Sequence, residues 1–227
     1  MKTVVLISAL ILWSSLAISQ EIISMQFEEL WWNFKNEEII DGVQYLNYEG
    51  SPYIYESDAA SVFLDERKKI EGLTMRYNVY NDLMEIKKGE KFYNVPRERI
   101  VPKIKLDEHL FFLMPYKMSK VKDIGYFECL LDNDEKCSLF LKHRILLTEE
   151  EVPKPFQEAR PPEFKNQTPI SYVTFGEDYL MPVLNKKDFI EMIPDNHTEI
   201  AQYMKKNKIK FRNPESVKQL IEYYNSL

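Results

Sequence analysis

The chain has little of what most catalytic and metal-binding motifs require. Among its 227 residues there are six glycines, two cysteines and three histidines. No glycine-rich phosphate loop, dinucleotide fingerprint, G-x-S-x-G or H-E-x-x-H motif occurs, so the sequence gives no support to those nucleotide-binding, serine hydrolase or zinc protease classes. A metal cluster of cysteine and histidine is not expected from so few, scattered residues. We therefore expect no cofactor and no bound metal.

Positive charge is also scarce. Thirty lysines and arginines oppose 36 aspartates and glutamates, which gives a formal net charge of −6. Lysines occur in pairs beside acids, as at Lys68 and Lys69 or Lys205 and Lys206, and this is typical of a mixed, solvated surface. Binding to nucleic acid needs a basic face that follows the phosphates, so we expect no nucleic-acid partner.

The long apolar run lies at the start of the chain. Lys2 precedes an uncharged stretch from Val4 to Leu16, and Ala17 and Ser19 form an A-x-S cleavage pattern. The run is shorter than the roughly 20 residues of a membrane helix. It predicts a signal peptide over residues 1–19 and an exported mature chain, periplasmic, outer-membrane-associated or secreted, without a transmembrane segment. An uncleaved anchor is the alternative. Cleavage removes one lysine and no acid, so −6 becomes −7.

The two cysteines, Cys129 and Cys137, flank an acidic turn. If that turn is centred on Asn133, the cysteines face each other across a hairpin and a disulfide is geometrically feasible. It would contribute about 2.5 kcal/mol on the chain-entropy model. Two buried thiols on an apolar strand face are the alternative, and the spacing does not decide between them.

Strand patterns dominate residues 51–147, as in an antiparallel meander. The predicted strands cover residues 60–64, 69–87 with an internal turn, 91–95, 100–106, 109–114, 125–131 and 137–147. Five prolines in residues 149–169 disfavour both helix and central strand, so this segment is expected to be an extended connection across the surface. A further hairpin follows around residues 176–178, and Pro182 favours an edge strand. The β-rich domain therefore spans residues 20–184.

The pattern becomes helical over residues 185–227. Asn185 begins one predicted helix, Asn196 and Glu199 form a capping box for a second, and Asn213 with Pro214 begins a third. The third helix carries the apolar stripe Val217, Leu220, Ile221 and Tyr224. None can stand alone, so we expect them to pack on the sheet. The predicted fold class is α+β: an antiparallel β meander, as a twisted sheet or partly closed barrel, followed by a small C-terminal helical cap.

Residues 73–87, LTMRYNVYNDLMEIK, place an arginine and a glutamate inside a regular alternation. With Asn81 and Asp82 as a two-residue turn, Tyr77 faces Ile86 in a row that belongs to the core. Arg76 and Glu85 then become diagonal neighbours on the opposite, solvated face. A half-exposed salt bridge there is worth at most about 1 kcal/mol. The candidate polar surface consists of Arg76, Asn78, Tyr80 and Glu85.

Three segments carry a resemblance. Gly50 to Tyr53 (GSPY), the RYN-x-Y-x-D-x-M-E pattern of residues 76–85 and the terminal Tyr223-Tyr224-Asn225 resemble a family of exported, uncharacterised proteins common in the Bacteroidota. The resemblance implies a periplasmic or outer-membrane-associated location, a sheet followed by helices, and no assigned activity. No functional residue is carried over from it.

The missing catalytic motifs and the aromatic-rich sheet favour a non-catalytic, exported cell-envelope module that binds an envelope protein or a small ligand. An alternative is a carrier that holds an apolar or saccharide ligand between sheet and cap. A carboxylate-based hydrolase comes third, because it requires a cleft with two close carboxylates of shifted pKa. The sequence assigns no catalytic residue.

Overall fold

The computed structural model describes residues 28, 45, 47–65, 67–97, 101–118, 121–133, 135–149 and 160–227. The predicted signal peptide, residues 1–19, lies outside these residues. The described chain is an antiparallel sheet of ten strands with helices after its last strand, so the α+β class is confirmed, with the sheet as the larger part. None of the helices described is long and apolar enough to span a membrane.

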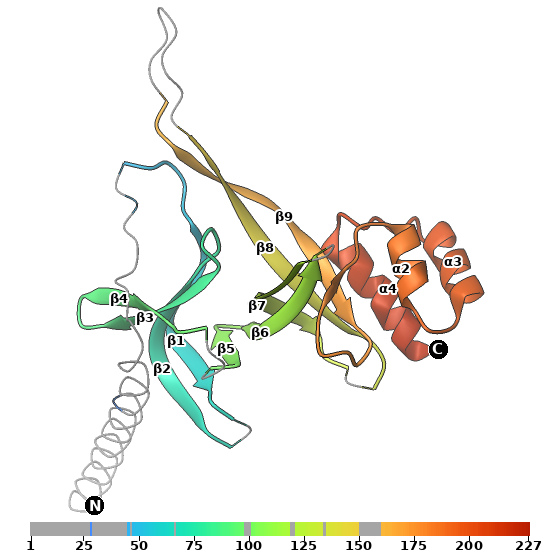
Figure 1. The fold of residues 1–227 in the computed structure, drawn as a ribbon, viewed down its shortest axis with the longest axis horizontal. Coiled ribbons are helices and arrows are strands. Elements are labelled where there is room, and N and C mark those ends of the chain that lie inside the picture. The colour runs from blue at the N-terminus through green and yellow to red at the C-terminus, as the bar shows by residue number, and fades with distance from the viewer. Residues whose placement is uncertain are drawn as a thin grey trace, which may run out of the picture.

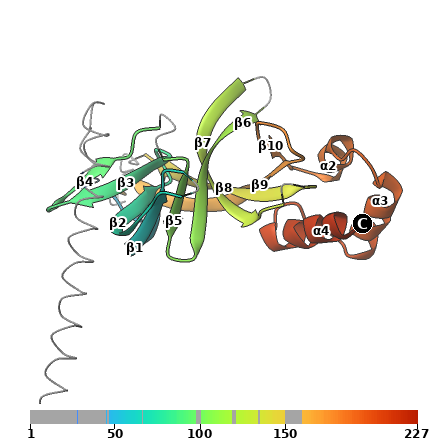
Figure 2. The ribbon, with the colours of Figure 1, turned by 90° about the horizontal axis from the view of Figure 1, so that it is seen from below.

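The elements follow one another in a simple order. The strands are β1 (Tyr53–Phe63), β2 (Lys69–Asn78), β3 (Leu83–Lys88), β4 (Lys91–Asn94), β5 (Lys103–Leu106), β6 (His109–Met118), β7 (Val121–Leu131), β8 (Ser138–Thr148), β9 (Glu163–Thr174) and β10 (Met181–Pro182), and the helices are α2 (Lys186–Met192), α3 (His197–Lys206) and α4 (Pro214–Ser226). Their order in the sheet is β10-β9-β8-β7-β6-β5-β1-β2-β3-β4. Strands β1–β4 lie at one end of the molecule and the helices at the other (Figures 1 and 2).

The sheet twists enough for separated strands to share one core. The predicted apolar row of β2 and β3 is buried, and Tyr77 packs edge-on against Phe111 of β6 and Tyr126 of β7. Beyond β9, the backbone of Leu180 forms two hydrogen bonds of 2.9 Å with β6, through Pro115 and Lys117. Because Tyr77 at the end of β2 packs on Tyr126 of β7, the β2–β3 turn lies close to β7 and to its neighbour β8.

The predicted register of the β2–β3 hairpin is wrong by two residues. Tyr77 faces Met84, and Arg76 lies directly opposite Glu85. The connection is longer than a two-residue turn, because β2 ends at Asn78 and β3 begins only at Leu83. Asp82 takes a positive φ of 55° in this turn, a conformation that aspartate tolerates better than most residues.

The hairpin of β7 and β8 also differs from the prediction. A register shift places Cys129 opposite Phe140 and Leu131 opposite Leu139. Cys137 precedes β8 and is buried against the helices. The cysteines are therefore not cross-strand partners, and both are thiols. The alternative of two buried thiols on one apolar strand face does not describe them either, because Cys129 is only half-buried and Cys137 lies outside β8. Burial raises the pKa of the Cys137 thiol.

Part of the proline-rich segment is a strand. Residues 163–169 belong to β9 and pair with β8 as far as Thr148, so the predicted surface connection is wrong over this stretch. The register shifts between the pairs Lys142–Ile170 and Arg144–Gln167, which leaves Thr168 and Pro169 opposite His143. Proline has no N–H for the ladder, and a bulge accommodates it. Pro182 lies on the edge strand β10, as predicted.

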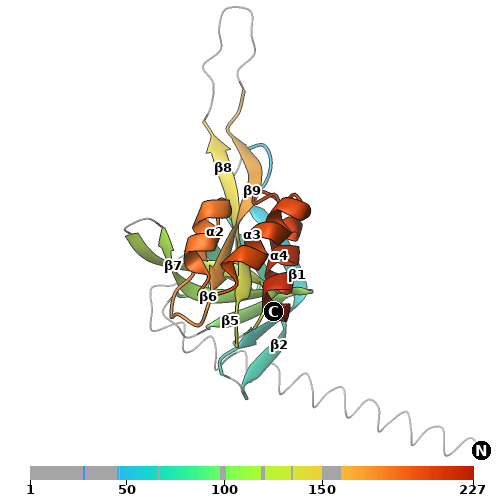
Figure 3. The ribbon, with the colours of Figure 1, turned by 90° about the vertical axis from the view of Figure 1, so that its right-hand side faces the viewer.

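The helices pack against the sheet through α4, which contacts β8 and β9 (Figure 3). Its predicted stripe is buried with Cys137, Leu139 and Val173. Asn185 and Asn213 cap α2 and α4 with their side chains, as expected. The capping box of α3 is wrong, because Asn196 has a φ of 55° and its side chain makes no cap hydrogen bond.

Candidate functional site

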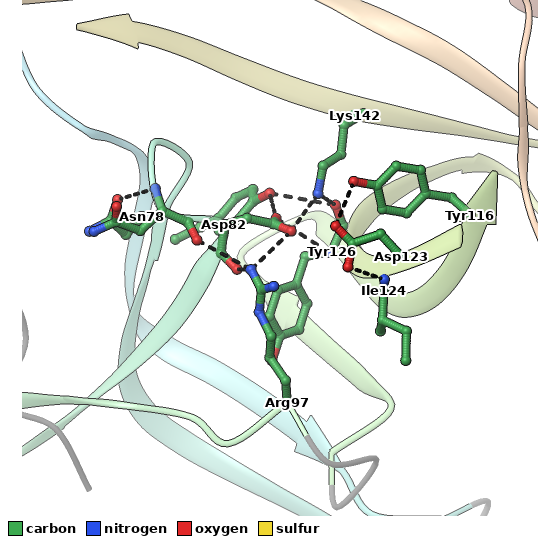
Figure 4. Close-up of polar contacts among 10 residues, drawn as sticks. Asn78, Asp82, Arg97, Tyr116, Asp123, Ile124, Tyr126 and Lys142 are labelled. Carbon is green, nitrogen blue, oxygen red and sulfur yellow. Dashed lines mark hydrogen bonds and ion pairs between the residues drawn. The ribbon is translucent and has the colours of Figure 1, made fainter. Parts of the chain in front are cut away.

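Asp82 is the centre of a polar network between the β2–β3 turn and strands β7 and β8 (Figure 4). Its Oδ1 accepts hydrogen bonds from the Tyr77 hydroxyl at 2.6 Å and from the Tyr126 backbone N–H at 3.4 Å. Its Oδ2 lies 2.6 Å from Lys142 Nζ and 3.1 Å from Arg97 Nη2. Four groups, from β2, from the segment after β4, from β7 and from β8, therefore converge on one carboxylate.

Lys142 is almost enclosed at this centre. Its ammonium donates to the Tyr126 carbonyl at 3.1 Å and lies 4.8 Å from the centre of the Phe127 ring. Burial lowers the pKa of Lys142, although the Asp82 carboxylate acts in the opposite direction. A lysine with a lowered pKa can serve as a nucleophile or base. Here its ammonium is surrounded by a carboxylate, a carbonyl and a ring, so we assign it a structural role.

Gly125 makes this approach feasible. A Cβ atom at this position would lie 2.5 Å from Lys142 Nζ and 2.6 Å from Asp82 Oδ2. Both distances are shorter than real Cβ contacts, and glycine is needed here for space rather than for its backbone freedom.

Three members of the candidate polar surface form a second buried centre. The Arg76 guanidinium lies between the rings of Tyr53 and Phe92, at 4.0 and 3.7 Å, and its Nη2 is 2.6 Å from Glu85 Oε2. Asn78 donates from Nδ2 to Glu85 Oε1 at 3.2 Å. Glu85 is fully buried and the Arg76 side chain is 18% exposed. The expected half-exposed salt bridge is therefore wrong, because rings from β1 and β4 cover this face too.

Tyr80, the fourth member, is separate from this centre and is 41% exposed. Its ring lies 5.3 Å from that of Phe164 on β9, on which Tyr48 stacks at 5.4 Å. Gly50, with a φ of 72°, approaches the Phe164 carbonyl too closely to carry a side chain. The structure thus does not gather the four predicted residues on one surface.

Glu128 of β7 lies between histidines of two neighbouring strands. Its Oε1 is 2.6 Å from His109 Nδ1 on β6, and its Oε2 is 2.5 Å from His143 Nε2 on β8. Burial alone raises the pKa of Glu128, but the hydrogen bonds to both histidines outweigh it and lower the pKa. Tyr55 stacks on His109 at 3.9 Å. Because both carboxylate oxygens are engaged, this group fits a structural role better than hydrolysis, which needs a carboxylate open to substrate.

Metal chemistry gains no support from these clusters. Within the described ranges, no group of three or more His, Cys, Asp or Glu side chains is arranged to hold a metal ion.

A groove of about 410 Å³ lies where β8 and β9 meet the turn between α3 and α4. We call it the sheet–helix groove. Residues that define it include Arg144, Thr168, Ser171, Leu184, Phe211 and Arg212. Its volume falls within the roughly 300–1,000 Å³ of small-molecule sites.

The bulge of β9 shapes the polar side of the groove. The displaced Thr168 carbonyl accepts hydrogen bonds from Arg144 Nε at 3.3 Å and Nη2 at 3.0 Å, which fixes the guanidinium at the groove. Ser171 is 2% exposed, and its Oγ has no hydrogen-bond partner. A buried hydroxyl without a partner is unusual in a folded protein, and Ser171 is one of the residues that line the groove.

A second hollow of about 230 Å³ lies near the ends of the β7–β8 and β9–β10 hairpins. It contains the carboxylates of Asp132 and Glu177. Glu177 already accepts hydrogen bonds from the Thr174 hydroxyl at 3.3 Å and the Phe175 N–H at 2.8 Å. The hollow is smaller than a typical small-molecule site. The sheet–helix groove is therefore the better candidate.

Sequence reasoning missed this groove. One signal was present, because Pro169 inside a strand implies a bulge that frees a carbonyl. Arg212 ends a basic run, KKNKIKFR, of which the pattern of paired surface charge accounts only for Lys205 and Lys206. No sequence signal marks Ser171, because the lack of a hydrogen-bond partner for its Oγ depends on tertiary packing.

Comparison with known proteins gives no match to a family model, to a curated protein or to a solved structure.

Proposed function

We propose that this chain is an exported, non-catalytic binding module of the cell envelope, and that its ligand is a small molecule held in the sheet–helix groove. The observation that carries the proposal is a groove of about 410 Å³ that contains a fixed arginine and a buried serine hydroxyl without a partner. The position of the groove between sheet and helices supports the hypothesis of a carried ligand.

The acid and base clusters support a binding role over catalysis. Asp82, Glu85 and Glu128 are each engaged by neighbouring cations or histidines. General acid–base catalysis needs such a group within reach of a substrate. The candidate polar surface is largely buried and offers little to an envelope protein, which favours a small ligand.

Native mass spectrometry of the exported protein tests the proposal. We expect the wild-type chain to retain a small molecule, and we expect Leu184→Trp, which fills the groove from its rim, to lose it. Leu146→Trp is the matched control, because both leucines are more than half exposed and Leu146 does not line the groove. A wild-type chain that retains no added mass, and that no small-molecule fraction of an envelope extract stabilises against heat, contradicts the proposal.

A further inference from the structure

The sheet–helix groove presents cations without an acidic partner. Among the described side chains, neither Arg144 nor Arg212 forms an ion pair, and the residues found to line the groove include no aspartate or glutamate. In a chain of net charge −6, two arginines at one groove without a carboxylate are a local exception. Guanidinium groups bind carboxylate and phosphate oxygens with paired hydrogen bonds.

Arg144 is held in a position from which it can bind such an anion. The guanidinium has five N–H donors, and contacts with the Thr168 carbonyl use the Nε and one Nη2 direction. Its remaining donors are available while the side chain is held in place. Because one edge of the guanidinium is already anchored, the side chain loses less conformational entropy when an anion binds.

Ser171 adds a neutral donor at the same groove. Its Oγ is buried and has no hydrogen-bond partner, while its carbonyl is already used by the Val183 N–H at 2.9 Å. An anionic oxygen that accepts from this hydroxyl would satisfy a group that is otherwise costly to bury.

Beside the polar residues Gln167 and Thr168, the groove also has an apolar part. Phe211 and Val183 line it with Ile170, and Leu184 is 52% exposed at the same place. An exposed leucine beside an aromatic ring is a surface that an apolar ligand segment covers. A saccharide, which carries many hydroxyl donors, would find no carboxylate acceptor in this lining.

Basic residues continue outward from the groove along the end of α3. Lys205, Lys206, Lys208 and Lys210 precede Arg212, and all five side chains are exposed. None of them forms an ion pair in the part of the chain that the structure describes. This local positive field favours the approach of an anion in a salt-dependent way.

We propose that the groove ligand is an anionic amphiphile, with one carboxylate or phosphate group bound by Arg144, Arg212 and Ser171 and an apolar chain against Phe211 and Leu184. This identification rests on the proposed function and names the chemical class of its ligand.

Calorimetric titration with matched probes tests the class. Decanoate, decyl phosphate and decanol share one chain length, and inorganic phosphate supplies the head group alone. We expect decanoate and decyl phosphate to bind, and decanol and inorganic phosphate to bind at least about ten-fold more weakly, which corresponds to one charge-assisted contact. Arg144→Gln and Arg212→Gln should each weaken decanoate binding by about ten-fold. Arg67→Gln, an exposed arginine between β1 and β2 that does not line the groove, should leave it unchanged.

The other outcomes separate two kinds of failure. Equal binding of decanol and decanoate, both lost in Leu184→Trp, would overturn the anionic class and leave the proposed function standing. Equal binding of inorganic phosphate and decyl phosphate would overturn the apolar part. Absence of binding for all probes, or binding that Leu184→Trp leaves intact, overturns the assignment of this ligand class to the groove. Binding only to anionic phospholipid vesicles, unchanged by Leu184→Trp, would identify a membrane-facing basic surface and overturn the groove site.

Discussion

Lys142 Nζ lies 2.6 Å from Asp82 Oδ2, so one ion pair joins strand β8 to the β2–β3 turn across the core. The close approach of Gly125 allows this contact. Filling the space at Gly125 with a methyl group therefore tests the Asp82–Lys142 ion pair without changing either charge.

We expect Gly125→Ala to lower the free energy of unfolding by about 1–3 kcal/mol, because a methyl group in a filled site displaces both ends of the ion pair. Urea unfolding at neutral pH measures the change. In a chain that already carries Lys142→Ala, the same substitution should cost clearly less, since one of the displaced atoms is gone. Equal costs in both backgrounds would show that the ion pair is not what the methyl group disturbs.

The Arg76–Glu85 pair should be expensive to break. Glu85→Ala leaves the Arg76 guanidinium partly buried between two rings without its carboxylate, and losses of about 3–5 kcal/mol are typical of such uncompensated charges. Glu71→Ala is the matched control on β2, because that glutamate is mostly exposed and should change the free energy of unfolding by less than about 0.5 kcal/mol. Similar losses for the two variants, measured by urea unfolding, would contradict a buried pair.

Alkaline pH should destabilise the fold through its tyrosines. Burial, with a contribution from Glu128, raises the pKa of Tyr55 to about 12, and burial raises that of Tyr172 to about 12. Below pH 10 these tyrosines are protonated in both states and the stabilisation is fully present. Between pH 10 and about pH 12 the unfolded chain releases protons that the folded chain keeps, so the free energy of unfolding falls.

Urea midpoints measured from pH 9 to about pH 12 follow this loss, and tyrosinate absorbance shows when the folded rings ionise. Lys142 acts in the opposite direction over part of the range, because its lowered pKa makes the unfolded chain bind more protons. Tyr172→Phe should reduce the slope, and Tyr80→Phe, at an exposed ring, is the control. A midpoint that stays constant over this range would contradict the raised pKa values.

The end of α3 offers a stabilising substitution. Lys208 has a φ of 52° directly after the helix, and the Ile209 N–H bonds back to the Met204 carbonyl at 3.1 Å. This left-handed position favours glycine, so Lys208→Gly should stabilise the chain by about 1 kcal/mol. Lys206→Gly removes the same charge inside the helix and should destabilise by about 1 kcal/mol. Thermal unfolding compares the two, and effects of the same sign would contradict the assigned backbone conformations.

Local patterns predicted those parts of the fold that depend on neighbours in sequence. The apolar row of Met75, Tyr77 and Ile86 follows from strand alternation, and the starts of α2 and α4 follow from Asn185 and Asn213. The burial of Glu85 does not follow, because alternation tells which face a side chain takes and leaves open what covers that face. Tyr53 and Phe92 cover it here, from the strands on either side of the β2–β3 pair.

The candidate site was harder to predict for the same reason. Arg144 and Arg212 come from a strand and from a turn between helices, and no sequence spacing relates them. The two histidines around Glu128 share a strand face only once the register of β6, β7 and β8 is known. In both cases the missing information was strand register and packing, which residue type alone does not provide.

The contacts of Asp82 have a consequence for how the chain acquires its structure. Its partner Tyr126 follows it by 44 residues, and Lys142 comes later still. Native contacts over such separations form later than a local hairpin, because loop-closure entropy must be overcome first. During synthesis from the N-terminus, the β2–β3 hairpin is therefore made well before the strands that cover its apolar row. The nascent chain should need a chaperone that shields this hairpin until β8 has been made.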